Sequence, residues 1–332
     1  MTRSTVMFAV SAPHQIGPVI VDKIARITAA FDADLELFRC VFDSDAIASE
    51  QAGPERTQAE IEQLVLRARQ ELEAAAEPFA ARGLHVRTSI RWDHPPYEGI
   101  VRQVLRHRPR LLFAQSTHRD PVARLFLQHT DWKLIEACPC PLVLLKSARP
   151  YAEPLVIAAV DPGHRHDKPA ALDEQILDGA ALMSTALAGR LAVFHARTPW
   201  DEAARSDPDL RDLPEYRDEE IHRAYLAQVE ARVLALAEKH HISAAQVHVE
   251  DGHPAELLPQ FVGQHQADLL VMGAVSRSRL RRALIGHTAQ RVLDALDTDV
   301  LIVKPPGFRT PVRRQSHHHV RSGAEARPRL IW

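Results

Sequence analysis

The segment that begins at Gly273 carries residue types suited to holding an anion. It reads Gly273, two residues, Ser276, nine residues, Gly286, His287 and Thr288. Gly273 follows the apolar run 269–272, where glycine lets the backbone turn closely after a strand. His287 and Thr288 begin the next amphipathic segment, and free N–H groups at a helix N-terminus attract anions. The spacing is compatible with a phosphate cradle, although spacing alone favours ordinary turn and cap glycines.

Acidic side chains follow two other apolar runs of the same half. Asp161 comes directly after 155–160, and its alternative role is that of a turn former. Glu250 and Glu256 flank the end of another run and could form an acid pair near the same edge, although a solvated face explains them as well. The carboxyl ends of parallel strands meet at one edge of a sheet, where ligands of such sheets bind.

The elements that must position these residues occur twice in the chain. Leu111–Lys146 aligns without a gap with Leu269–Lys304, and His129-Thr130 falls on His287-Thr288. Upstream, the run from Thr5 is similar to the run from Pro154. This self-similarity predicts a tandem duplication of one domain of about 150 residues.

Each half alternates short apolar runs with segments of helical periodicity. The predicted strands are Val6–Val10, Leu35–Phe42, Val86–Trp92, Leu111–Gln115, Leu142–Leu145, Leu155–Val160, Leu191–His195, Val247–Glu250, Leu269–Met272 and Val300–Val303. This order predicts an α/β fold with two tandem, doubly wound, parallel five-stranded sheets covered by helices on both faces. The predicted domains are 1–148 and 149–306, and residues 307–332, rich in Arg and His, are predicted to form a flexible tail.

The glycine segment and the tandem arrangement resemble the universal stress protein family. Gly273-x2-Ser276-x9-Gly286-His287 is similar to its Gly-x2-Gly-x9-Gly-Ser/Thr nucleotide loop. Thr130-Asp131-Trp132, the Gly286-x-Thr288-Ala289 form of the loop, and Asp299-Val-Leu-Ile-Val-Lys304-Pro resemble the E-type members. The resemblance implies two universal stress protein domains that pair through their last strands around a pseudo-twofold axis.

The resemblance also implies a site in the second half. ATP-binding members hold adenosine between the first-strand Asp, matched by Asp161, and the glycine loop. The implied cofactor-binding residues are Asp161, Gly273, Ser276, Gly286, His287 and Thr288. Ser276 and His287 depart from the family pattern, which puts ATP binding, and the Mg²⁺ that would accompany ATP, in question.

The first half departs further from the family's loop. Ser11 stands at the Asp position, and Gln115, His118 and Gln128 replace the three glycines. The sequence therefore predicts a degenerate first domain with no nucleotide site.

No complete catalytic or metal-binding set is found in the sequence. Asp161-Pro-Gly163-His164 and the Arg-rich segment after Ser276 partly resemble α/β nucleotidyltransferases, a remote alternative. Cys138 and Cys140 are predicted to be buried, inert thiols, and His240-His241 to interact with a helix dipole. We therefore expect no enzyme activity beyond slow ATP hydrolysis, and no metal site.

Composition narrows the function classes. The 332 residues carry 41 Lys and Arg against 43 Asp and Glu, a balance that argues against nucleic acid or an anionic membrane as partner. No apolar run is long enough to span a membrane and no secretory signal is recognised, so we expect a cytoplasmic protein.

The favoured interpretation of the sequence is a stress-response protein that binds an adenine nucleotide. The alternative is a module that binds an apolar metabolite, a lipid or a partner protein. The protein partner and further homodimerisation are left open.

Overall fold

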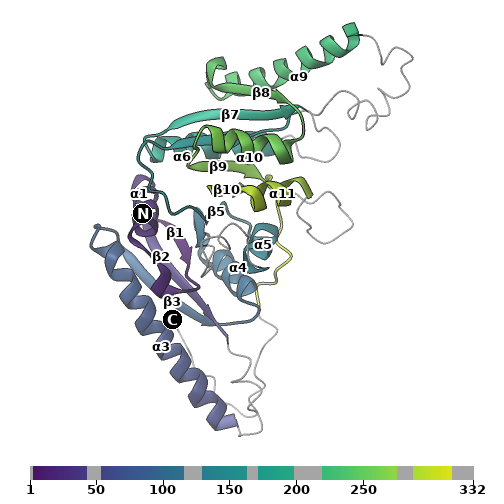
Figure 1. Ribbon diagram of the computed structural model, residues 1–332. Helices are drawn as coiled ribbons and strands as arrows, with labels where there is room; N and C mark the ends of the chain where they lie inside the picture. Colours follow the sequence, from purple (N-terminus) through teal and green to yellow (C-terminus); the bar gives the residue numbers. More distant parts are fainter. Residues whose placement is uncertain are drawn as a thin grey trace. The chain divides into compact units, whose positions relative to one another are not determined.

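The computed structural model describes residues 3–42, 54–115, 129–162, 171–197, 219–274 and 287–315. Contacts divide the chain into two units (Figure 1). Unit 1 comprises residues 1–119, 128–150 and 309–332, and unit 2 comprises 120–127 and 151–308. Within the described residues, no helix is long and apolar enough to cross a membrane.

Unit 1 is an α/β unit with five parallel strands in the order β3-β2-β1-β4-β5. Its elements are β1 (Ser4–Ala9), η1 (Pro13–Gln15), α1 (Pro18–Ala30), β2 (Ala33–Val41), α3 (Pro54–Ala80), β3 (Val86–Trp92), α4 (Pro96–His107), β4 (Leu111–Gln115), α5 (His129–Ala137) and β5 (Leu142–Leu145). Consecutive residues of β1 are fully buried, as expected for a strand covered on both faces. Helix α1 contacts α3, and α4 contacts α5.

Unit 2 repeats this architecture with the strand order β10-β9-β6-β7-β8. Its elements are β6 (Leu155–Ala159), α6 (Ala171–Ala186), β7 (Arg190–Arg197), α9 (Glu219–Lys239), η4 (Ala244–Gln246), β8 (Val247–Asp251), α10 (Pro254–Gln264), β9 (Leu269–Gly273), α11 (His287–Ala295) and β10 (Asp299–Val303). The predicted strands are confirmed to within a few residues at their ends, and the predicted fold class is confirmed.

Strand register sets the correspondence between the two copies. Val6 pairs with Leu111 in unit 1, as Val156 pairs with Leu269 in unit 2. By this register, Ser11 is the counterpart of Asp161. The sequence alignment that matches Thr5 with Pro154 differs from this register by one residue. The later elements keep the predicted offset, because α5 and α11 begin and end at equivalent residues.

One apolar side chain among the residues after β10 is buried. Val312 is 8% exposed, and Arg102 Nε on α4 donates a hydrogen bond to the carbonyl oxygen of Arg313 at 3.1 Å. Arg102 is itself buried and bound through Nη1 to both oxygens of Asp93. The described start of the segment that composition assigns to a tail is thus packed on unit 1, while 316–332 lie outside the described residues.

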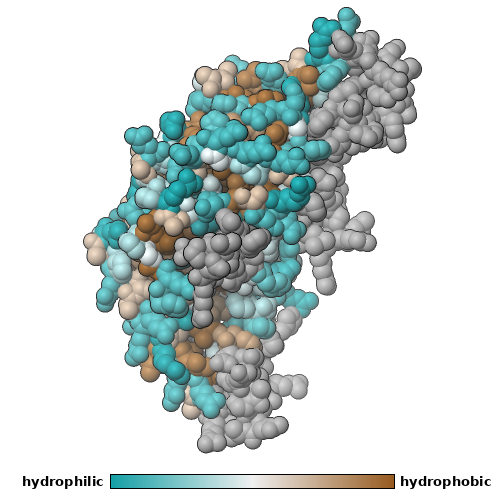
Figure 2. All heavy atoms as spheres, viewed as in Figure 1, coloured by the Kyte–Doolittle hydropathy of each residue, from teal (hydrophilic) through white to brown (hydrophobic). Residues whose placement is uncertain are grey.

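The surface of the described residues is largely polar. Figure 2 shows hydrophilic residues over most of the drawn face, with hydrophobic residues visible in small separate areas. Among the described residues, two large hydrophobic side chains are classed as exposed, Leu66 and Leu182.

A buried carboxylate ties three elements of unit 1 together. Glu36 on β2 is fully buried and accepts hydrogen bonds from Ser89 Oγ and Gln103 Nε2, both at 2.6 Å. Arg87 Nη2 and His107 Nδ1 each lie 2.7 Å from its other oxygen. Burial opposes ionisation of Glu36, but these four partners together lower its pKa.

Replacement of Glu36 tests this cluster. The Glu36→Gln variant leaves buried donors poorly matched and should lower the free energy of unfolding by roughly 1–3 kcal/mol at neutral pH, since the charged partner Arg87 is half exposed. A carboxylate whose pKa is lowered by folding stabilises the protein above its unfolded-state pKa, and this contribution is lost as pH falls through the lower folded-state pKa. The difference from the parent in urea unfolding should therefore shrink below about pH 4. Glu71→Gln, on an exposed side chain, is the control and should have little effect.

Gly273 is packed too tightly for any side chain. A Cβ atom at this position would lie 2.6 Å from Leu172 Cδ2 and 2.9 Å from Leu172 Cγ. Leu172 is fully buried on α6, which contacts both β6 and β9. The glycine at the end of β9 therefore has a packing role in addition to any role in ligand binding.

Alanine substitution measures that packing role. Gly273→Ala should destabilise the protein by about 1–3 kcal/mol through overpacking against Leu172. Gly263→Ala on α10 is the matched control, because nothing lies within 4 Å of a Cβ there. That variant should be neutral or stabilising by up to about 1 kcal/mol. Equal unfolding midpoints for the two variants would show that the close approach of Leu172 does not constrain position 273.

Candidate functional site

The candidate site lies at the topological switch point of unit 2. Strand β6 pairs with β7 on one side and with β9 on the other. The chain runs outward from β6 to β7 and β8 and then returns to β9, so the connections diverge beyond the carboxyl ends of β6 and β9. Ligands of doubly wound sheets bind in the crevice at this point.

The predicted site residues fall into three groups. Asp161 and Gly273 come at the neighbouring carboxyl ends of β6 and β9, as the strand register requires. Thr288 is half-buried in the first turn of α11, and His287 is the first residue of that helix. Ser276 and Gly286 lie outside the described residues, as does His164 of the nucleotidyltransferase-like segment.

Asp161 is held in place from α6 and stands near a buried histidine. Its backbone N–H donates a hydrogen bond to Asp173 Oδ1 at 2.9 Å, and Asp173 is buried in the first turn of α6. Asp161 Oδ1 lies 4.0 Å from His195 Nδ1 on β7. The side chain of Asp161 remains 40% exposed, which leaves its carboxylate accessible to a ligand.

Sequence reasoning missed Asp173 and His195 as members of this site. His195 is 5% exposed at its side chain, and its Nδ1 lies 3.0 Å from the carbonyl oxygen of Val160. A carbonyl oxygen only accepts, so Nδ1 carries the proton. The one available signal was a polar residue that ends the otherwise apolar run 191–195.

The charge at the end of β6 favours hydrogen-bond donors over phosphate. Asp161 and Asp173 place two carboxyl groups at this strand end, and carboxylates repel the oxygens of a phosphate group. An ionised carboxylate accepts hydrogen bonds from hydroxyl and amino groups. This part of the site therefore suits a sugar or a base, and a phosphate would need the N–H groups of a helix N-terminus such as that of α11.

Polar contacts orient the segments after β9 and β10. Lys304 Nζ donates a hydrogen bond to the carbonyl oxygen of Ala274 at 3.1 Å and lies 4.8 Å from the centre of the Phe308 ring. Arg291 on α11 lies 3.7 Å from Glu256 on α10, and these two helices are in contact. Glu256 and Arg291 are both exposed, so this contact agrees with a solvated face and not with an acid pair between Glu256 and Glu250.

The equivalent strand end of unit 1 is bridged by a side chain. Gln115, the counterpart of Gly273, ends β4, and its Nε2 donates a hydrogen bond to the carbonyl oxygen of Gln15 at 3.3 Å. This hydrogen bond crosses from β4 to η1, the segment that follows β1. With Ser11 in place of Asp161, the described part of this strand end lacks the carboxylate of its counterpart, and a glutamine stands where unit 2 has Gly273.

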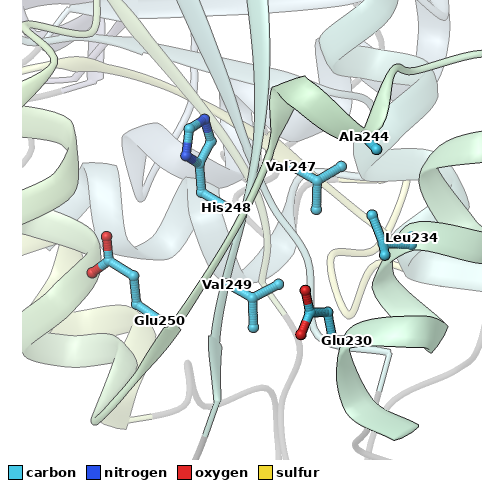
Figure 3. Close-up of a pocket in the computed structure, with 7 residues that line it drawn as sticks. All are labelled: Glu230, Leu234, Ala244, Val247, His248, Val249 and Glu250. Carbon is cyan, nitrogen blue, oxygen red and sulfur yellow. The ribbon is translucent and has the colours of Figure 1, made fainter. Parts of the chain in front are cut away.

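A separate pocket of about 490 Å³ lies between α9 and β8 (Figure 3). Val247 and Val249 point to the same side of β8 as Leu234 and Glu230, while His248 and Glu250 point to the other side. The lining mixes aliphatic side chains with two carboxylates. Such a lining is more polar than the mostly apolar lining that is typical of small-molecule pockets.

His240 interacts with side chains and not only with a helix dipole. Its Nε2 lies 2.5 Å from Glu174 Oε2, and its Nδ1 lies 3.2 Å from Asp178 Oδ1, both on α6. Lys239 also binds Glu174, and the two partners lower the pKa of that carboxyl group. The residues that follow α9 are therefore fastened to α6 by charged groups.

A family profile and several known proteins are similar to this chain in sequence. The profile described as "Universal stress protein family" matches residues 3–146 and 156–304. The chain is 27% identical to universal stress protein E of Escherichia coli K12, over 71% of this chain and 74% of the relative. It is 22% identical to the universal stress protein E homolog of Haemophilus influenzae, over 85% and 87% of the two chains.

Solved structures support the fold. A putative universal stress protein from Pseudomonas aeruginosa has a TM-score of 0.66 at 24% identity, covering 91% of this chain and 94% of its own. A universal stress protein from Archaeoglobus fulgidus has a TM-score of 0.60 at 14% identity, covering 90% and 98%. With both halves matched by the family profile, the chain belongs to the universal stress protein family of stress-response proteins and carries two of its domains in the tandem, E-type arrangement.

Proposed function

We propose that this protein binds an adenine nucleotide weakly in unit 2 and acts in the stress response by changing its shape or partners. The residues proposed to contact the nucleotide are Asp161, Gly273, Ser276, Gly286, His287 and Thr288. The observation that carries the proposal is the exposed carboxylate of Asp161 beside the end of β9 at the switch point. We propose no catalytic cycle. ATP hydrolysis should be measured in the same samples as ATP binding.

The charge distribution supports one orientation of the proposed ligand. Asp161 would accept hydrogen bonds from ribose hydroxyls or the adenine amino group, since it is an exposed acceptor next to a second carboxyl group. The phosphates would lie toward the first turn of α11, with Mg²⁺ as their counterion. Binding of the nucleoside part should therefore depend on Asp161 more strongly than binding of the phosphates does.

The duplicated fold supplies a matched control for Asp161. We expect saturating Mg-ATP, at 100 times its dissociation constant, to stabilise the parent by about 2.7 kcal/mol. For domains of this size, each kcal/mol raises the unfolding midpoint by about 2–4 °C, so the expected rise is roughly 5–11 °C. Asp161→Ala should abolish the rise, whereas Ser11→Ala, at the equivalent position of unit 1, should keep it. Gly273 is a poor choice for this test, because any side chain there collides with Leu172.

Two further arms separate the outcomes. Adenosine and AMP should each raise the midpoint of the parent, and inorganic triphosphate should act equally on the parent and on Asp161→Ala. An equal rise with Mg-ATP in the parent and Asp161→Ala would remove Asp161 from the site. No rise with any nucleotide would reject nucleotide binding and favour a module for another ligand or a protein partner.

A further inference from the structure

Unit 2 lacks a carboxylate at the place where Glu36 is buried in unit 1. Strand register places Ala192 on β7 at the position of Glu36 on β2, and Arg190 at the position of Asp34. A methyl group and a guanidinium group therefore stand in unit 2 where unit 1 carries two acids. The surroundings of this place differ between the units as well.

Two of the four groups that hold Glu36 have a histidine as their counterpart. Strand register places His248 on β8 at the position of Ser89 on β3. Helices α4 and α10 begin at equivalent prolines, so His265, which follows α10, stands at the position of His107. The other two groups, Gln103 and Arg87, correspond to Phe261 and Gln246.

A groove of about 530 Å³ lies at this place in unit 2. Ala192, His248 and His265 belong to its lining, together with Leu155 and Arg190, the first residues of β6 and β7. The groove therefore lies at the amino end of these strands, on the edge opposite the proposed nucleotide site.

The groove offers polar groups that other side chains do not use. The guanidinium of Arg190 and the ring nitrogens of His248 have no hydrogen-bond partner in the described part of the chain. His248 points to the opposite side of β8 from Val247 (Figure 3), toward α10. His265 Nδ1 lies 3.0 Å from the carbonyl oxygen of Phe261, so Nδ1 carries the proton and Nε2 is left for a ligand.

No acidic side chain is among the described residues that line the groove. Its charged or titratable members are Arg190, His240, His241, His248 and His265. The carboxylates of α6 nearby, Glu174 and Asp178, are already bound to His240, and Lys239 also binds Glu174. Glu250 lies on the same side of β8 as His248 but outside the lining. The groove is therefore suited to an anion.

We propose that this groove binds a small organic acid, whose carboxylate takes the place that the Glu36 carboxylate has in unit 1. His248 and His265 donate to its two oxygens, and Arg190 supplies a further positive charge. The aliphatic side chains of Leu155 and Ile242 line the same groove and contact the apolar body of the ligand.

Unit 1 shows why the arrangement suits a carboxylate. Ser89 donates to Oε1 of Glu36, and His107 Nδ1 lies 2.7 Å from Oε2. The counterparts of these two groups are His248 and His265, whose ring centres lie 5.8 Å apart. One donor is thus provided for each oxygen of a planar anion with two oxygens, whereas a phosphate has further oxygens to satisfy.

Protonation of the two histidines couples this site to pH. His265 donates through Nε2 only when its ring is charged, because the Nδ1 proton is directed at Phe261. Burial and the charge of His265 lower the pKa of the His248 ring, and Glu250 opposes this shift. A bound carboxylate favours the charged rings, so binding takes up protons and tightens as pH falls.

The test is isothermal titration calorimetry of the full chain with sodium benzoate at pH 6, in a buffer that contains no carboxylate. We expect one site per chain with a dissociation constant of about 1 mM or below. Binding should be at least about tenfold weaker at pH 8. Inorganic phosphate should bind more weakly than benzoate at pH 6.

Substitutions in the groove isolate the role of the carboxylate. Ala192→Glu gives unit 2 the side chain that unit 1 carries at this position, so its own carboxylate should take the place and abolish benzoate binding. His265→Phe keeps a ring against Phe261, 4.1 Å away in the parent, but removes both ring nitrogens and should weaken binding at least about tenfold.

Two control variants should bind benzoate as the parent does. His253→Gln removes a histidine at the opposite end of α10. Asp161→Ala removes the carboxylate of the proposed nucleotide site, at the other edge of the sheet. The unfolding midpoint of each variant, measured in parallel, separates loss of the groove from loss of the fold.

Several results would overturn the proposal. These are the absence of benzoate binding by the parent at pH 6, the affinity of the parent retained in Ala192→Glu or His265→Phe, or tighter binding of phosphate than of benzoate. Loss of binding in Asp161→Ala would assign the benzoate to the opposite edge. If Ala192→Glu does not fold, His265→Phe decides the outcome.

Discussion

Parallel pairing of β6 with β9 is the constraint on which the candidate site depends. Both strands are buried in succession along their length, because helices cover both faces of the sheet. Their register brings Asp161 and Gly273 to one edge, although most of unit 2 separates them along the chain. The same packing brings α6 against Gly273, so the space at this edge is set by Leu172 as well as by the glycine.

The two copies share apolar cores in β1 and β6, but they differ at the carboxyl ends of β4 and β9 and at the buried position of Glu36. Where β9 ends in Gly273, β4 ends in Gln115, which bridges to η1. Core positions of β1 and β6 are apolar in both units, since a buried face tolerates only apolar side chains or fully paired polar ones. Glu36 illustrates the second case, and strand register places Ala192 at its position in unit 2. Divergence at the sheet edge is the physical basis for proposing different roles for the two units.

Periodicity and repetition were enough to predict most of the elements. The buried strands read as apolar runs, and the repeat placed Gly273 and Asp161 after two of them. His195 and Asp173 were missed because neither stands next to Asp161 in the sequence, and only the pairing of β6 with β7 and the packing of α6 bring them there. The burial of Val312 was not predicted for a similar reason, since an isolated apolar residue between Pro311 and Arg313 carries no periodic signal.

The sequence by itself determined the fold class and the duplication, because these follow from hydrophobic pattern and from the recurrence of residue types at a constant spacing. It determined the family through the resemblance of the segment from Gly273 to Thr288 to the family's loop. Tertiary structure decided which polar groups meet: the Asp161 N–H and the Asp173 carboxylate, the Gln115 bridge and the Glu36 cluster. Hydrogen bonds and ion pairs act over a few ångströms and depend on direction. Such contacts are therefore set by strand register and helix packing, which no single stretch of the chain encodes.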